Sequence, residues 1–254
     1  MEPEKNKGVL MAEWPAGYDK IVLDQVDSTM LEAARQASDL RGPVWICALS
    51  QTAARGRRGR AWVNPVGNLA ATLVMPLEDA PELRALRSFV AALALFDAIA
   101  EVTGRVDGLS LKWPNDVLLN GGKLAGILLE SLGPCLSVGI GVNLVSAPDA
   151  GEVEAHAVRP VSLLSETGVD VAPEVFLDVL TAAYARYEAQ FQTYGFAPIR
   201  EAWLSRAARL GEVITARIGT TEVTGTFETV DAEGQIVLGT ARGRQAIAAA
   251  DIFF

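Results

Sequence analysis

Hydrophobic and polar positions follow two periods along the chain, and together they predict a protein of mixed α and β structure. Short alternating or continuously apolar runs predict strands over residues 20–26, 43–50 and 68–76. Apolar positions three and four residues apart predict helices over residues 28–37, 82–104 and 173–195. We therefore expect an α+β fold in which a mixed central β-sheet is flanked by helices.

The pattern continues with three strands in residues 109–144, the first two joined by a tight turn at residues 120–123. From about Arg209 the segments shorten, with strands over residues 211–218, 221–230, 234–240 and 244–254. Strands of this length and spacing are typical of a small antiparallel β-barrel. The expected organisation is a tail (residues 1–18), a main domain (19–207) and a small C-terminal domain (208–254).

Composition and charge restrict the function classes. Half of the 254 residues (50%) are hydrophobic and the net charge is -9, which argues against a broad basic surface for nucleic acid. Two cysteines, Cys47 and Cys135, cannot form a disulfide framework, and the single His156 argues against a zinc site. The N-terminus lacks the apolar segment of a secretion signal, and residues 89–100 form too short an apolar run to span a membrane. We expect a cytoplasmic protein.

A cationic loop, QTAARGRRGRAW, stands out in this acidic chain. We call residues 51–62 the arginine loop; it carries Arg55, Arg57, Arg58 and Arg60 between glycines. Glycine lets a backbone approach a ligand closely, and guanidinium groups offer paired donors to carboxylate or phosphate. The loop therefore predicts a site for a small anion, although a solvated connector or a nucleic-acid contact remains an alternative at this point.

A second candidate is KWPND, in which Lys112, Asn115 and Asp116 surround a proline. A lysine beside a carboxylate suits phosphate together with Mg²⁺, since magnesium prefers oxygen ligands. Turns have the same composition, so the motif taken alone is equally compatible with an ordinary turn. Weaker candidates follow: Lys123 at the start of an apolar strand could be an edge charge, and GIGVN brings Asn143 after two alternating glycines.

Taken in order, STM, QTAARGRRGRAW, KWPNDVLLNGGKLAGILLE and GIGVN resemble the signatures of biotin–protein ligases. The resemblance runs from about residue 19 to residue 254. It implies the biotin/lipoate ligase catalytic fold and an SH3-like barrel for the C-terminal domain. The chain departs from the family pattern at Met30, where asparagine is usual, at Ala54, where glycine is usual, and at its C-terminus, which lacks Gly-Glu-Val.

The resemblance also implies roles for individual residues. Biotin-binding positions would be Ser28, Thr29, Met30, Gln51, Arg55, Gly56, Arg57, Lys123 and Gly126. Positions for ATP and the adenylate would be Arg57, Arg58, Arg60, Trp62, Lys112, Asn115 and Asn143. Catalysis would depend on Lys123, Lys112, Asp116 and Arg57, and Asp116 would also hold a metal.

The implied reaction has two steps, adenylation of biotin by ATP with Mg²⁺ and transfer of biotin to a lysine of a biotin carboxyl carrier protein. Neither step requires an enzyme nucleophile, and the sequence offers no Ser-His or Cys-His arrangement. The repulsion between the arginines predicts that the loop is mobile when empty and orders on binding. Because fewer than about 20 residues precede the first strand, too few for a typical DNA-binding domain, we expect ligase activity without sequence-specific DNA binding.

Two other functions remain open from the sequence. A lipoate–protein ligase would share the fold and the adenylation chemistry, and a biotin-versus-lipoate pyrophosphate-exchange assay separates the two. A nucleic-acid-binding module using RGRRGR would bind without ATP and weaken steeply with salt. The oligomeric state is open as well, a homodimer included.

Overall fold

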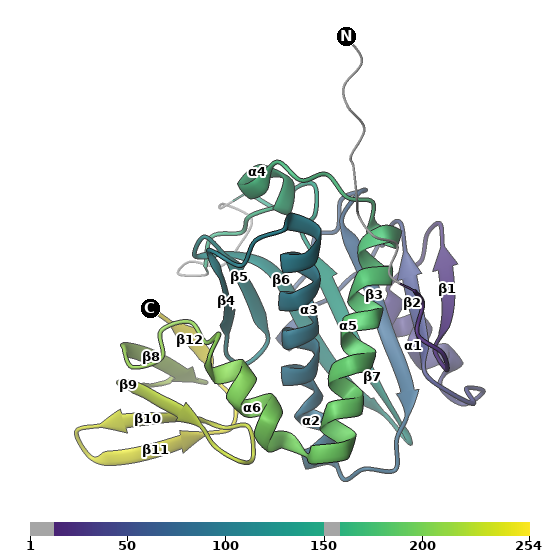
Figure 1. Ribbon diagram of the computed structural model, residues 1–254. Helices are drawn as coiled ribbons and strands as arrows, with labels where there is room; N and C mark the ends of the chain where they lie inside the picture. Colours follow the sequence, from purple (N-terminus) through teal and green to yellow (C-terminus); the bar gives the residue numbers. More distant parts are fainter. Residues whose placement is uncertain (1–12, 150–157) are drawn as a thin grey trace.

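A seven-stranded mixed sheet forms the centre of the computed structural model, which describes residues 13–149 and 158–254 (Figure 1). Its order is β1-β2-β3-β7-β6-β5-β4, with only β1 and β2 pairing in parallel among neighbouring strands. The strands are β1 (Asp19–Leu23), β2 (Val44–Ala48), β3 (Leu69–Pro76), β4 (Leu109–Lys112), β5 (Asp116–Leu119), β6 (Gly122–Leu132) and β7 (Cys135–Val142). The expected α+β class with a mixed sheet is confirmed.

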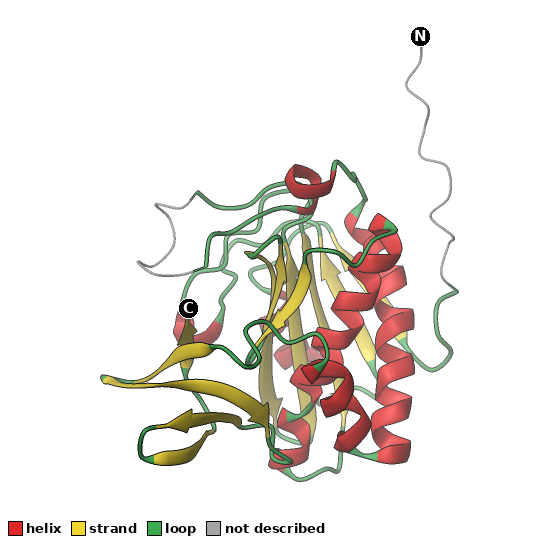
Figure 2. Ribbon diagram, turned by 60° about the vertical axis from the view of Figure 1, so that its left-hand side comes forward, coloured by secondary structure: helices red, strands yellow, loops and turns green. Residues whose placement is uncertain are grey.

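Helices pack on both faces of this sheet, but unequally (Figures 1 and 2). The helices are α1 (Thr29–Gln36), α2 (Pro81–Ala85), α3 (Arg87–Thr103), α4 (Leu163–Thr167), α5 (Pro173–Tyr194) and α6 (Phe196–Leu204). Along β2, Trp45 and Cys47 belong to the core shared with α3 and α5, whereas Val44 and Ile46 pack with Ala33 of α1. The long helices therefore cover one face, and α1 covers only part of the other.

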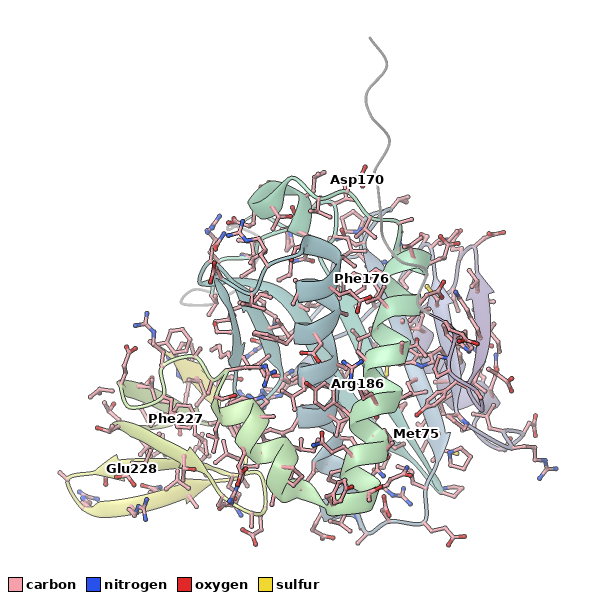
Figure 3. All side chains as sticks on the ribbon, in the orientation of Figure 1. Met75, Asp170, Phe176, Arg186, Phe227 and Glu228 are labelled. Atoms are coloured by element: carbon pink, nitrogen blue, oxygen red, sulfur yellow. The ribbon has the colours of Figure 1, made fainter. Side chains whose placement is uncertain are left out.

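The helix boundaries follow local signals in the sequence. Ser28 caps α1, since its hydroxyl accepts from the Met30 amide, and α3 ends at Gly104 with φ 67°. The helix expected over residues 82–104 is divided at Leu86, a buried residue that ends α2. The helix α6 was not among the elements expected from the sequence; it contains Pro198 in its first turn, a position that proline tolerates. Phe176, labelled on α5 in Figure 3, is fully buried in the core.

Most strand boundaries lie within two residues of those expected, and three differences are larger. The first strand ends at Leu23 rather than at residue 26. Residues 109–119 form two antiparallel strands, β4 and β5, because the chain reverses direction between Lys112 and Asp116, where Pro114 has no amide hydrogen to donate to the ladder. The final segment divides into two strands as well. The tight turn at Asn120 and Gly121 is confirmed, with both residues at positive φ.

The C-terminal domain is an antiparallel sheet of order β11-β10-β9-β8-β12, as expected for an SH3-like unit. Its strands are β8 (Val213–Ile218), β9 (Thr221–Val230), β10 (Ile236–Thr240), β11 (Gly243–Ile247) and β12 (Asp251–Phe253). The domain is fixed to the main domain at Gly234, whose carbonyl accepts from Nε1 of Trp113 at 3.0 Å. A Cβ at Gly234 would lie 2.8 Å from Leu86, so the two surfaces are in close contact.

Three expectations concern the chain outside these elements. His156 and residues 1–12 of the expected tail lie outside the described residues, whereas Trp14 and Tyr18 are partly buried against the core. The domain boundaries at residues 18 and 207 stay predictions. Among the helices of residues 13–149 and 158–254, none has the length and apolar character that crossing a bilayer requires.

We predict that both thiols resist alkylation in the native protein at pH 8. Cys47 and Cys135 are free and buried, and burial raises the pKa of Cys47 to about 12 and that of Cys135 above its usual value. The reactive thiolate is therefore scarce at this pH. Iodoacetamide labelling followed by mass spectrometry should show two labels only after denaturation; rapid labelling of the folded protein would contradict this.

Candidate active site

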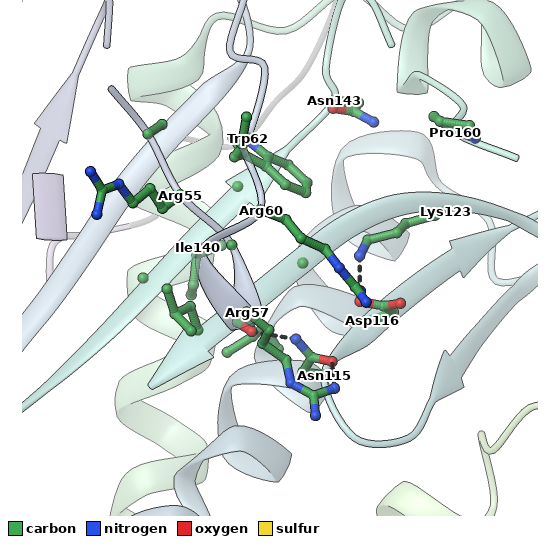
Figure 4. Close-up of a pocket in the computed structure, with 18 of the residues that line it drawn as sticks. Arg55, Arg57, Arg60, Trp62, Asn115, Asp116, Lys123, Ile140, Asn143 and Pro160 are labelled. Carbon is green, nitrogen blue, oxygen red and sulfur yellow. Dashed lines mark hydrogen bonds and ion pairs between the residues drawn. The ribbon is translucent and has the colours of Figure 1, made fainter. Parts of the chain in front are cut away.

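A pocket of about 460 Å³ lies on the sheet face opposite α3 and α5, beneath the arginine loop and beside β12 (Figure 4). It brings together nearly all of the residues singled out from the sequence. Those lining it are Ser28, Thr29, Met30, Gln51, Arg55, Gly56, Arg57, Arg60, Trp62, Lys112, Asn115, Asp116, Lys123, Gly126 and Asn143. Arg58 is not among them.

One end of the pocket is a network of hydroxyl and amide groups at the start of α1. The Thr29 amide donates to Oε1 of Gln51 at 2.8 Å, and the hydroxyl of Thr72 donates to that of Thr29 at 2.8 Å. Ser28, Thr29 and Thr72 are buried. Because each bond joins a different element, α1, the arginine loop and β3 are held in one arrangement, and this end suits a neutral polar group of a ligand.

Glycines of β6 and β7 form the floor of the pocket, where the absence of a side chain makes room for two larger residues. A Cβ at Gly139 would lie 2.6 Å from Sδ of Met30, and one at Gly141 would lie 2.5 Å from the Trp62 ring. A Cβ at Gly126 would lie 3.3 Å from the same ring. The alternation noted in the sequence therefore places Met30 and Trp62 side by side over the sheet, and makes the middle of the pocket apolar.

The other end of the pocket is cationic. Lys112 and Asp116 face each other as register partners of β4 and β5, and Nζ of Lys123 lies 2.7 Å from Oδ1 of Asp116 (Figure 4). Burial lowers the pKa of Lys112, although the negative charge of Asp116 opposes the shift. A partly buried cation that is costly to desolvate is a sign of a functional site, and here it suits a carboxylate or phosphate.

Asn115 and Asn143 are held by backbone carbonyls at the edges of the pocket. Nδ2 of Asn115 donates to Ile127 at 2.6 Å, which leaves Oδ1 to accept from Arg57 at 3.4 Å. Nδ2 of Asn143 donates to Val161 at 3.1 Å, and the side chain is almost completely buried. Both amides therefore have fixed orientations.

The four arginines of the loop point in different directions. Arg57 lies toward Asn115. Burial lowers the pKa of Arg57, and the negative charges of Asp251 and Asp116 act in the opposite direction. Arg55 extends away from the Lys123–Asp116 pair, in contrast to Arg60 (Figure 4). Arg58 pairs with Asp251 of β12 at 2.7 Å instead of lining the pocket. The role of Arg58 in ATP binding stays a prediction.

Three lining residues come from the C-terminal domain and were not anticipated: Asp251, Ile252 and Phe253. Their segment, AAADIFF, has no glycine, lysine or spacing that indicates a site. These residues are distant from the arginine loop in the sequence. They reach the pocket because the C-terminal domain packs beside β4. Trp113, which the sequence showed only as part of KWPND, helps to fix that packing.

Comparison with known proteins agrees with this geometry. Residues 22–143 match the Biotin/lipoate A/B protein ligase family, and residues 210–254 match the Biotin protein ligase C terminal domain. The chain is 56% identical over 238 residues to a Biotin–[acetyl-CoA-carboxylase] ligase of Paracoccus denitrificans, with 92% of this chain and 99% of that protein covered. It is 30% identical to the Bifunctional ligase/repressor BirA of Bacillus subtilis (strain 168), over 93% of this chain and 74% of that protein.

The fold comparison gives the same result. A solved biotin protein ligase from Aquifex aeolicus, in complex with biotin and ATP, superimposes with a TM-score of 0.79 at 28% identity, covering 92% of this chain and 97% of that chain. The fold and the cationic pocket thus define a ligase of the biotin/lipoate catalytic fold. The C-terminal match and the Paracoccus relative distinguish biotin ligases from lipoate ligases, so the chain belongs to the biotin protein ligase family.

Proposed function

We propose that this enzyme attaches biotin to a lysine of a biotin carboxyl carrier protein, with ATP as the second substrate and biotinyl-adenylate as the intermediate. One observation carries the proposal: a single pocket joins a hydroxyl and amide end, an apolar middle and a cationic end. Biotin has the matching parts, a neutral ureido group, an apolar body and a carboxylate that meets the phosphates of ATP. The resemblance to ligases named for biotin, or solved with biotin and ATP, supports it.

In the first step an oxygen of the biotin carboxylate attacks the α-phosphorus of ATP and the bond to pyrophosphate breaks. In the second, a carrier lysine amine attacks the carbonyl of the mixed anhydride, AMP leaves, and the amine proton is released. Ser28, Thr29 and Gln51 would hold the ureido group, while Lys123 would orient the carboxylate. Lys112 and Arg57 would stabilise the charge on the phosphates, because fixed cations act most strongly where water is excluded.

The pocket also fits magnesium. Oδ1 of Asp116 is buried and accepts no hydrogen bond apart from its ion pair with Lys123. Mg²⁺ usually takes one or two protein carboxylates together with substrate phosphates, so a dedicated cluster is unnecessary; the described residues contain no group of three or more potential ligands. Asp116 would hold the ion, and the ion would neutralise part of the negative charge of the phosphates.

Several expectations about partners stay predictions within this proposal. The carrier protein is proposed from the chemistry of the second step, and the cytoplasmic location from the two free thiols. A homodimer and the absence of sequence-specific DNA binding are likewise predictions. The lipoate alternative is disfavoured by the C-terminal match, and the nucleic-acid alternative by the inward direction of Arg57 and Arg60.

The test is biotin-dependent exchange of labelled pyrophosphate into ATP without any carrier protein. We expect exchange with biotin and none with lipoate, because adenylation precedes transfer. Adding a biotin carboxyl carrier domain should then give a product heavier by one biotin by mass spectrometry. Exchange with lipoate alone, or no exchange with either acid, would contradict the proposed function.

A further inference from the structure

The arginine loop is tied to the C-terminal domain by a single carboxylate. Oδ2 of Asp251 accepts from Arg58 at 2.7 Å and from Arg60 at 3.1 Å. The Asp251 side chain is only 15% exposed, whereas the two arginines are 45% and 42% exposed. We call these two ion pairs the Asp251 bridge. A third contact joins the same two parts of the protein, since Arg57 donates to the Ala250 carbonyl at 3.4 Å.

The carboxylate is a fixed point. Asp251 opens β12, where its register partner is Arg217 of β8, so its backbone is part of the sheet. That sheet is docked on the main domain through the Trp113–Gly234 hydrogen bond. One backbone bond adds to this, since the amide of Ala208, at the start of the C-terminal domain, donates to the Leu111 carbonyl at 2.8 Å. The position of Asp251 relative to the pocket is therefore set by the fold and not by the loop.

The loop is shaped to meet this point. Residues Arg57–Gly59 form a 3₁₀ turn in which Arg58 has φ 58° and Gly59 has φ 73°. A non-glycine residue rarely adopts this conformation without a compensating contact. The Gly56 amide donates to the Arg60 carbonyl at 2.8 Å and closes the turn. Successive arginines therefore diverge, Arg57 toward Asn115 and Arg58 toward Asp251.

Charge explains why one carboxylate has a large effect here. Arg57, Arg58 and Arg60 lie within one turn and repel one another when the loop folds. Burial alone would raise the pKa of Asp251, but the hydrogen bond from Arg60 and the charges of Arg60, Arg58 and Arg57 lower it. The carboxylate is thus ionised at neutral pH and offsets the repulsion at its source.

We propose that Asp251 is a positioning residue that holds the arginine loop folded over the pocket, so that retention of the adenylate depends on the C-terminal domain. The proposal deepens the function proposed above and rests on it. Arg58 and Arg60 hold the loop through the Asp251 bridge. Arg57 and Arg60 also line the pocket, so the same contacts fix their positions there. The alternative is that Asp251 competes with the ATP phosphates for the arginines, which predicts the opposite effect on ATP binding, and the experiment separates the two.

The experiment compares Asp251→Asn with the wild-type full chain and with Glu228→Gln. Glu228 of β9 pairs with Arg244 of β11, the edge strand opposite β12, and neither residue lines the pocket (Glu228 is labelled in Figure 3). Its variant therefore removes a similar carboxylate from the same domain outside the pocket. Each protein is given biotin, Mg-ATP and pyrophosphatase without carrier, and release of biotinyl-adenylate into solution is measured. We expect Asp251→Asn to release it about tenfold faster, because hydrogen bonds between charged groups are lost, and Glu228→Gln to match the wild type.

A second readout reports on the loop itself. Trypsin cleaves after arginine, and Asp251→Asn should be cut faster within residues 55–60 with both substrates present, because exposed mobile loops are the preferred sites of nicking. Arg58→Met should reproduce part of the effect and add nothing to Asp251→Asn, since both remove the same contact. Arg58→Met lies outside the C-terminal domain, so it still tests the bridge if Asp251→Asn unfolds.

The outcomes are distinguishable. If the wild type forms no adenylate, the proposed function fails. If the wild type forms it and the variants release it at the wild-type rate, the proposed role of Asp251 is wrong. A lower KM for ATP in Asp251→Asn, with unchanged adenylate release, would show that Asp251 competes with phosphate and would also overturn the proposal. Additive effects of the two substitutions would contradict a shared contact.

Discussion

Lys112→Met should slow biotin-dependent pyrophosphate exchange by about 10²–10³-fold while leaving the free energy of unfolding undiminished. Losing one preorganised charge at a reacting group typically costs this much in rate. Stability should not fall, because burial lowers the pKa of Lys112, so the folded protein bears a desolvation cost that methionine removes. Exchange kinetics and urea unfolding of the same preparations measure both quantities. A variant that loses rate and stability in proportion would show that Lys112 is structural.

The pH profile gives an independent check on the same residue. A lowered pKa means that Lys112 loses its proton at a lower pH than an exposed lysine would. Exchange should therefore decline on the alkaline side earlier than for a lysine of ordinary pKa. Lys112→Arg, which keeps its charge throughout, should remove that decline even if its maximum rate is lower. An unchanged alkaline limb would contradict the assignment.

Lys123→Met should also slow exchange by about 10²–10³-fold, with Lys20→Met as the matched control. The two lysine side chains are similarly exposed, at 30% and 27%, and each forms an ion pair, Lys123 with Asp116 and Lys20 with Asp178. Only Lys123 lies in the pocket. Unlike Lys112→Met, Lys123→Met should lower stability, because it leaves Asp116 buried without its cation. Equal rates for the two variants would make Lys123 a surface charge.

Much of the fold could be predicted because its signals are local. The period of the apolar positions located α3 and α5, and glycine marked the end of α3. The same reasoning joined β4 and β5 into one strand, since Leu111 and Val117 are both buried and continue one apolar run across the turn. Periodicity records which side chains are buried, but it does not record where the backbone reverses.

The site was predictable for a similar reason, and so was its main omission. KWPND and the arginine loop are compact motifs whose chemistry is visible in the sequence. Asp251 is not, because its neighbours are apolar and its partners Arg58 and Arg60 are distant in the chain. The expectation of a mobile empty loop counted only the repulsion among arginines. In the Asp251 bridge a negative charge offsets that repulsion. This contact could not be predicted from the sequence, because it depends on how the two domains pack together.

Gly141→Ala should raise the KM for ATP by about tenfold or more, because the new Cβ would occupy the place of the Trp62 indole. That Cβ would lie 2.5 Å from Cε2 of Trp62, closer than nonbonded carbons approach, so the ring must move. If Trp62 covers the adenylate, as the family resemblance implies, the displaced ring no longer stacks on the base. Stacking of an aromatic side chain on a base contributes roughly 1–3 kcal/mol, and each 1.4 kcal/mol corresponds to a factor of ten.

Gly139→Ala is the matched control, two residues away on the same strand of the same floor. Its Cβ would lie 2.6 Å from Sδ of Met30, so it should raise the KM for biotin and leave that for ATP unchanged. Trp62→Ala completes a double-mutant cycle. Once the indole is gone, Gly141→Ala should add little, because the clash exists only with that ring. If Gly141→Ala has its full effect in the Trp62→Ala background, the glycine serves the ligand directly and Trp62 does not cover the adenylate.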